Sequence, residues 1–203
     1  MQNWRRRGIG TPAGWYTLLG VVLLGVTQWI PYGTAQRTAR LEQRADEIAA
    51  LLLEALRPNL RPLGRDDMPH VLATFAALAL RDGVHIGDLE TAEPPPDALL
   101  ALRNKHYAFH VAVSPPAPNA TVARGTESAY EVLAWPLEAI GPGHCAFFHP
   151  DDAQRAYTRN LNASFRGFGK HRPLPGRSHR RETTALEVTS FYRSYDDERW
   201  LVY

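Results

Sequence analysis

A long uncharged stretch near the N-terminus constrains this chain more than any other feature. No charged side chain occurs between Gly8 and Gln36, and residues 15–30 read WYTLLGVVLLGVTQWI. With its neutral flanks, residues 11–32, the stretch is long enough to cross about 30 Å of hydrocarbon as a helix. Aromatic residues stand at both of its ends, as is typical of a membrane interface: Trp15, Tyr16, Trp29 and Tyr32. The sequence therefore predicts a transmembrane helix or signal-anchor at residues 11–32.

Basic residues on either side of this stretch bear on its orientation. Residues 1–10 include three consecutive arginines at 5–7, which predicts a basic tail that stays in the cytoplasm. Residues 33–203 would then form an extracytoplasmic domain of a single-pass cell-membrane protein. Arg37, Arg40 and Arg44 follow the stretch and weaken this charge asymmetry. Two alternatives remain: a signal peptide cleaved near the small residues 33–35, which would leave a secreted domain, and a buried core helix.

Composition excludes several classes of site. The only cysteine is Cys145, so neither a disulfide framework nor a four-cysteine metal site can form within one chain. Hydrophobic residues make up 44% and charged residues 22% of the sequence, which is normal for a globular protein. A net charge of +2 indicates little about partners, so the distribution of charge matters more.

Helical periodicity follows the apolar stretch. Over residues 34–57 apolar side chains recur at three- and four-residue steps, which predicts an amphipathic helix that ends before Pro58. A second helix is expected from about Asp67 to Arg81, with Pro69 in its first turn and Gly83 after its end. Residues 97–105 are a candidate for a short third helix.

The periodicity changes to two in the second half of the chain, which predicts β-strands. Six segments have this pattern or a short apolar run between turn residues: 106–114, 130–139, 144–149, 156–159, 186–192 and 199–203. No long helix separates them, so an antiparallel meander is expected and a parallel sheet is not. The predicted fold class is α+β: a long N-terminal helix, half in the membrane and half amphipathic, packed on a small antiparallel sheet with one or two extra helices.

This arrangement resembles the type IV pilin-like proteins and the pseudopilins of type II secretion. The local similarity lies in Tyr107-Ala-Phe-His-Val, in Tyr130-Glu-Val-Leu-Ala-Trp-Pro, and in Phe147-Phe148 ahead of an aspartate-containing turn. The resemblance implies a membrane-anchored, non-enzymatic component of an envelope or secretion assembly, whose partners are the membrane and other envelope or pilin-like subunits. Prepilins carry a glutamate early in the mature helix, where this chain has Pro12 or Leu19. The similarity does not extend to that processing site.

The resemblance also suggests a cation site. Some pseudopilins bind calcium through an acidic loop near the C-terminus, and Asp196, Asp197 and Glu198 are the candidate ligands here. Calcium takes roughly six to eight oxygen ligands, so these three carboxylates would need a second loop. An ordinary turn is the alternative, since aspartate side chains accept hydrogen bonds from nearby backbone amides.

The most distinctive segment after the N-terminus is residues 153–181, which contains no Asp or Glu. Glycines and prolines indicate a loop, and Phe165 and Phe168 lie among its basic residues. The candidate anion-binding residues are Arg166, Lys170, Arg172, Arg177, Arg180 and Arg181. They predict, as an alternative function, a tethered module that binds an anionic polymer such as a polysaccharide or nucleic acid. A solvated loop paired with acidic residues elsewhere is the competing interpretation.

Enzyme function is not expected. The nucleophile-elbow, P-loop and dinucleotide-binding motifs are all absent from the sequence, and no small-molecule substrate or other cofactor is indicated.

Overall fold

A computed structural model describes residues 12–58, 62–114, 130–138, 143–151, 154–181 and 191–203. Its first element is α1, a helix of 45 residues. The elements in chain order are α1 (Pro12–Leu56), η1 (Arg65–Asp67), α2 (Met68–Asp82), β1 (Glu90–Ala92), β2 (Leu100–Arg103), β3 (Tyr107–Val113), β4 (Tyr130–Pro136), β5 (Ala146–Pro150), β6 (Ala156–Thr158), β7 (Phe191–Arg193) and β8 (Arg199–Val202).

The strands form one antiparallel sheet of eight, in the order β1-β2-β3-β4-β5-β6-β8-β7. Its centre is the β3–β4 pair, in which Tyr107 lies opposite Pro136 and Val113 opposite Tyr130. Every residue of β4 and of β5 is buried. Both faces of the sheet are therefore covered, unlike an antiparallel sheet with one solvated face.

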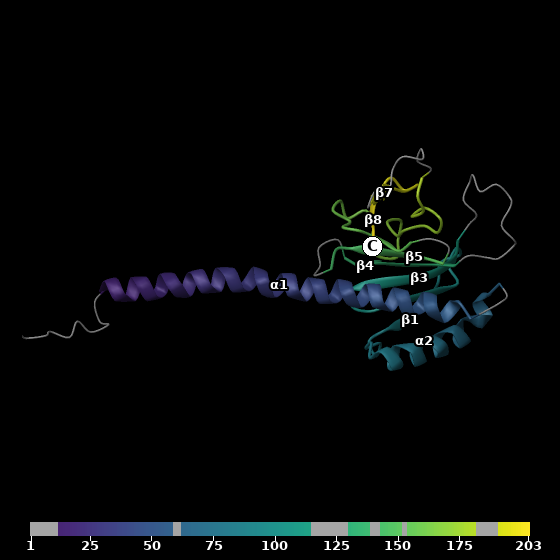
Figure 1. The fold of residues 1–203 in the computed structure, drawn as a ribbon, viewed down its shortest axis with the longest axis horizontal. Coiled ribbons are helices and arrows are strands. Elements are labelled where there is room, and N and C mark those ends of the chain that lie inside the picture. The colour runs from purple at the N-terminus through teal and green to yellow at the C-terminus, as the bar shows by residue number, and fades with distance from the viewer. Residues whose placement is uncertain (1–11, 59–61, 115–129, 139–142, 152–153, 182–190) are drawn as a thin grey trace, which may run out of the picture.

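The helices cover one face. α1 runs along β3, β4 and β5, and α2 packs beside α1 (Figure 1). Ile48 and Leu52 of α1 are fully buried and belong to the same apolar cluster as Phe109 and Val132 of the sheet. The hydrophobic effect thus holds the C-terminal part of α1 on the sheet. Burial of each large apolar side chain contributes about 1.5–3 kcal/mol to the free energy of folding.

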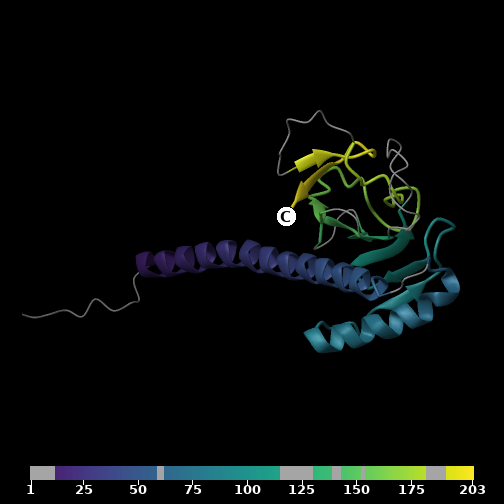
Figure 2. The ribbon, with the colours of Figure 1, turned by 45° about the vertical axis from the view of Figure 1, so that its right-hand side comes forward.

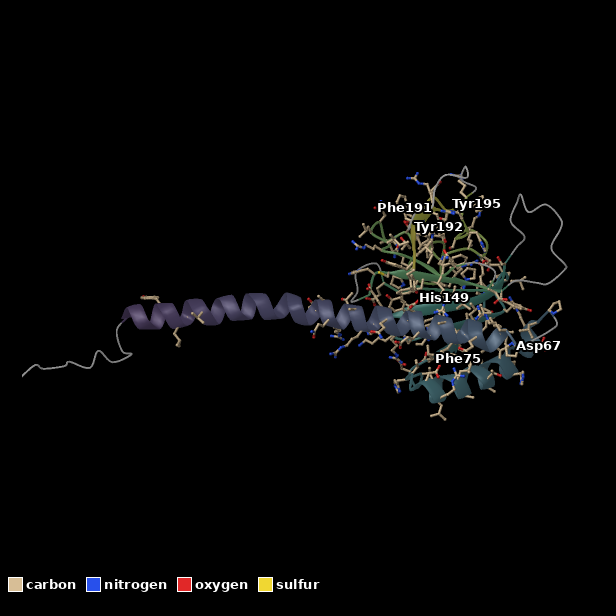
Figure 3. The ribbon with its side chains drawn as sticks, viewed as in Figure 1. Asp67, Phe75, His149, Phe191, Tyr192 and Tyr195 are labelled. Carbon is tan, nitrogen blue, oxygen red and sulfur yellow. The ribbon has the colours of Figure 1, made fainter. Side chains whose placement is uncertain are left out.

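The other face is covered by irregular segments and by the β7–β8 hairpin (Figure 2). The cluster on this face contains Leu133 and Trp135 of β4, Phe148 of β5, Phe165 and Trp200. Side chains alternate along each strand, so β4 supplies Val132 to the helical face and Leu133 to the opposite one. In Figure 3, Tyr192 and Tyr195 lie in this second layer, whereas Phe75 lies in α2 on the helical side.

The second helix is where its sequence signals predicted it. α2 spans Met68–Asp82, with Pro69 at its start. Gly83 follows in the left-handed conformation with φ of 69°, and its amide donates to the carbonyls of Ala79 and Leu80. Glycine is favoured in this position because it has no Cβ to clash with the backbone. The strands expected at 106–114, 130–139, 144–149, 156–159 and 199–203 are confirmed within three residues at each end. Of the strand expected at 186–192, residues 191–192 lie in β7, and 186–190 lie outside the described residues.

The predicted fold class is wrong. The sheet is not small: with eight strands it dominates the folded domain, and β1 and β2 were not predicted. β2 lies within residues 97–105, where a short helix was expected. The run Leu99-Leu100-Ala101-Leu102 is too short to distinguish a buried strand from a helix by periodicity alone. Residues 100–103 form a strand because they pair with β3.

The predicted membrane location is also wrong. Among the residues that the structure describes, no helix has an apolar stretch of the length that a bilayer requires. The predicted transmembrane, single-pass segment at residues 11–32 and the predicted location in the cell membrane are therefore both contradicted.

Candidate functional site

The N-terminal half of α1 extends beyond the folded domain (Figures 1 and 2). Its described apolar side chains are exposed: Tyr16 is 76% exposed, Leu18 58%, Leu19 59% and Val21 66%. Burial against the sheet begins only at Ala45. We call residues 12–40 the projecting half of α1. Large apolar side chains exposed together on one stretch of helix are typical of a surface that contacts a partner.

Polar contacts fix the docked half of α1 to the sheet. Glu42 Oε1 accepts hydrogen bonds from the backbone amides of His144, at 2.9 Å, and Cys145, at 3.1 Å. Asp46 Oδ1 lies 2.7 Å from His149 Nε2 and also accepts from the Tyr203 hydroxyl. These carboxylates join α1 to the segment before β5, to β5 itself and to the C-terminal residue, so the direction of the projecting half is set by the domain.

The environment of Asp46 alters its acidity. Partial burial would by itself raise the pKa of this carboxyl, but hydrogen bonds from His149 and Tyr203 favour the ionised form, and so do the charges of His149 and Arg155. The net result is a lowered pKa. Asp46 is therefore a carboxylate near neutral pH, positioned against fully buried His149.

The single cysteine has no character of a nucleophile. Burial and the neighbouring Glu42 carboxylate raise the pKa of the Cys145 thiol to about 12. The thiolate is the reactive form, and this environment disfavours it. Cys145 therefore packs beside the core as a small apolar group.

The basic segment lies on the face opposite α1, and we use this term for its described residues, 154–181. Arg172 forms a bidentate ion pair with Asp97, with both N···O distances 2.9 Å. Arg181 pairs with Asp197 at 3.0 Å, and the Arg180 guanidinium lies 5.9 Å from the centre of the Tyr192 ring. Part of the predicted anion-binding set is thus already engaged within the protein.

A hollow of about 310 Å³ opens in this layer, between the basic segment and the turn before β8. It brings together three predicted anion-binding residues, Lys170, Arg172 and Arg177, with two predicted calcium ligands, Asp196 and Glu198. The rest of its wall is Ser164, Phe165, His171, Leu174 and Tyr195. Four predicted residues do not line the hollow: Arg166, Arg180, Arg181 and Asp197.

The acidic turn uses its carboxylates internally. Asp196 Oδ1 accepts from the Ser194 hydroxyl and from the Glu198 amide, the latter at 3.2 Å. Glu198 Oε1 accepts from the Ser164 hydroxyl. No group of three or more His, Cys, Asp or Glu side chains suited to a metal ion occurs in the described ranges. Calcium binding at Asp196, Asp197 and Glu198 stays a prediction.

A buried polar cluster was not predicted from the sequence. Glu131 of β4 is 0% exposed, and its Oε1 accepts the Gly176 amide at 2.8 Å. Its Oε2 lies 3.0 Å from His179 Nε2, which also lies 2.7 Å from the Ser114 hydroxyl. The sequence does contain a signal for this residue. Glu131 alternates with Leu133 and Trp135, which places it on the same face of a buried strand as these two apolar residues.

This cluster does not have the geometry of a catalytic triad. In a Ser–His–acid triad the histidine meets the hydroxyl through one ring nitrogen and the carboxylate through the other. Here Ser114 and Glu131 both meet Nε2 of His179. The histidine therefore cannot pass a proton from the hydroxyl while the carboxylate holds its second nitrogen, and the cluster instead ties the basic segment to β4.

Comparison with protein-family models, with curated proteins and with solved structures finds no match to this chain.

Proposed function

We propose that this chain is a non-enzymatic assembly protein, and that the projecting half of α1 packs against the same segment of further copies. The observation that carries the proposal is the exposure of Tyr16, Leu18, Leu19 and Val21 on a part of the helix that the folded domain does not cover. The pilin-like character of the sequence supports the same class of role, a subunit that acts through protein contacts.

The choice of a second copy as partner rests on the form of this surface. The sequence from Gly8 to Gln36 contains no charged residue, so one groove of a partner would leave much of this segment exposed. Several identical helices in a bundle cover one another on all sides, which is how helices without a polar face are accommodated. The docked half supports this arrangement, because Glu42 and Asp46 hold the helix in a constant direction relative to the domain.

The magnitude of the effect is sufficient for association. Burial of one leucine side chain contributes about 1.5–3 kcal/mol. Each leucine removed from the contact should then weaken association by at least about tenfold, since 1.4 kcal/mol corresponds to one decade.

The test is the concentration dependence of the mass of the full chain, measured by sedimentation equilibrium. The variant Leu18→Gln/Leu19→Gln should shift assembly to at least about a hundredfold higher concentration. The matched control is Leu80→Gln/Leu161→Gln, which replaces two leucines that are each 84% exposed on the folded domain. Circular dichroism should show equal helix content in all three proteins.

A second measurement locates the contact. Leu19→Cys should form an interchain disulfide under mild oxidation, whereas Leu80→Cys on α2 should not. A chain that is monomeric at all accessible concentrations would contradict the proposal, as would monomers that bind to phospholipid vesicles through this segment.

A further inference from the structure

The hollow between the basic segment and the acidic turn has features of a binding site that are independent of the projecting helix. Its walls are of opposite character. Lys170, Arg172 and Arg177 supply hydrogen-bond donors on one side, and Glu198 supplies a carboxylate acceptor on the other, beside the internally bonded Asp196. Phe165, Leu174 and Tyr195 add apolar surface between them.

Two of the cations are available to a ligand. Arg172 is held by Asp97, and its side chain is only 16% exposed. Lys170 and Arg177 are exposed, and their side-chain nitrogens have no hydrogen bond or ion pair with any residue in the described part of the chain. Positive charge that no described residue neutralises, lying beside a concave surface, attracts an anionic group.

The walls are held in place before any ligand binds. The Asn160 side chain brackets Phe165 by accepting from its amide at 2.9 Å and donating to its carbonyl at 2.8 Å. Trp135 Nε1 donates to the Gly167 carbonyl at 2.8 Å, and Glu131 accepts the Gly176 amide at the same distance. A preformed site loses less conformational entropy on binding than a loop that must order.

The opposite wall limits the type of anion. Glu198 would repel a strongly charged ligand, whereas its second carboxylate oxygen, the one not bonded to Ser164, can accept a hydrogen bond from a hydroxyl group. Tyr195, Phe165 and Leu174 offer contact to a face of C–H groups. A volume of about 310 Å³ is at the small end of the range for ligand pockets, which favours a ligand of about one ring over a larger one.

We propose that this hollow binds an acidic monosaccharide unit, a uronate, whose carboxylate contacts Lys170 and Arg177 and one of whose hydroxyls donates to Glu198. The unit can come from a free sugar acid or from one residue of an acidic polysaccharide, because the recognised chemistry is the same. This inference goes beyond the assembly role, which does not require the hollow.

The experiment is isothermal titration of the full chain with sodium glucuronate at constant ionic strength. Glucuronamide and glucose serve as neutral analogues of the same size, and both should bind at least about tenfold more weakly because the charge-assisted contact is lost. A polyuronate chain is titrated in parallel. Tighter binding per site by the polymer would assign the polysaccharide as the source, and equal affinity would assign the free acid.

Variants locate the site. Lys170→Gln and Arg177→Gln should each reduce glucuronate affinity by about tenfold. Arg103→Gln is the matched control, because it removes one exposed arginine that pairs with Glu90 at the far edge of the sheet, and its affinity should stay within about twofold of the parent. Absence of saturable binding by both glucuronate and the polymer would overturn the proposal. So would an equal response to glucose, or an equal loss in Arg103→Gln.

Discussion

His149 Nε2 of β5 lies 2.7 Å from Asp46 Oδ1 of α1, and this contact joins the helix to the centre of the sheet. The His149 side chain is 0% exposed and that of Asp46 is 24% exposed. In Figure 3, His149 lies between the strands and α1. A partly buried carboxylate is stable in this position because it accepts hydrogen bonds from two side chains.

The stability of the domain should therefore depend on the charge of Asp46. Its pKa is lower in the folded protein than in the unfolded chain, so folding favours the ionised form. The contribution is complete above the ordinary aspartate pKa of about 4 and is lost as the pH falls through the lower folded value. Asp46→Asn should reduce the free energy of unfolding at pH 7 by about 1–3 kcal/mol. Urea titrations at pH 3, 5 and 7 check this, and the variant should lose less stability on acidification than the parent. Parallel pH profiles would contradict the assignment.

Replacement of Glu131 should destabilise the layer that carries the basic segment. Glu131→Ala leaves the Gly176 amide without its acceptor and His179 without its carboxylate, at a cost of about 2–3 kcal/mol. Glu131→Gln keeps one oxygen for Gly176 and should lose less. Glu138→Ala, at an exposed position just after β4, is the control and should stay within about 0.5 kcal/mol of the parent. Hydrogen exchange should show faster exchange at residues 171–181 in Glu131→Ala, and unchanged exchange there would count against this role.

The close contact between Gly143 and Tyr107 of β3 predicts that substitutions at these two positions change stability in opposite directions. A Cβ at Gly143 would lie 2.7 Å from Tyr107 Cε2 and equally close to its hydroxyl oxygen, and Tyr107 is 1% exposed. Gly143→Ala should therefore lower the free energy of unfolding by about 1–3 kcal/mol. The Tyr107 hydroxyl is buried without a hydrogen-bond partner among the described residues, so Tyr107→Phe should be neutral or stabilising. A large loss of stability in Tyr107→Phe would show that the hydroxyl has a partner.

Cys145 should be unreactive while the protein is folded. With a pKa of about 12, only about one thiol in ten thousand is ionised at pH 8. Alkylation by iodoacetamide should be slow in buffer and fast in denaturant, and a cysteine introduced at Leu80 should react rapidly in both. Glu42→Gln should raise the rate at Cys145, because it removes the charge that opposes the thiolate. Rapid alkylation of the folded parent would refute this view of the thiol.

Local signals were sufficient for several elements. The alternation in Tyr107–Val113 and Tyr130–Pro136 predicted two central strands, and Pro69 and Gly83 marked the two ends of α2. These signals lie within a few residues of the structure they specify, since alternation and capping depend on neighbours along the chain. The sequence also singled out the basic segment and the acidic turn, but it did not indicate that parts of both meet around one hollow.

The sequence by itself determined the central strands, the second helix and the absence of a disulfide framework. Tertiary structure alone decided that Leu100–Arg103 is a strand, that Arg172 is neutralised by Asp97, and that Glu131 and His179 share a buried contact. It also overturned the expected membrane span. The physical reason is that strand pairing, desolvation and charge neutralisation depend on which distant segments come into contact, and these contacts form only when the whole sheet and both of its covering layers are in place.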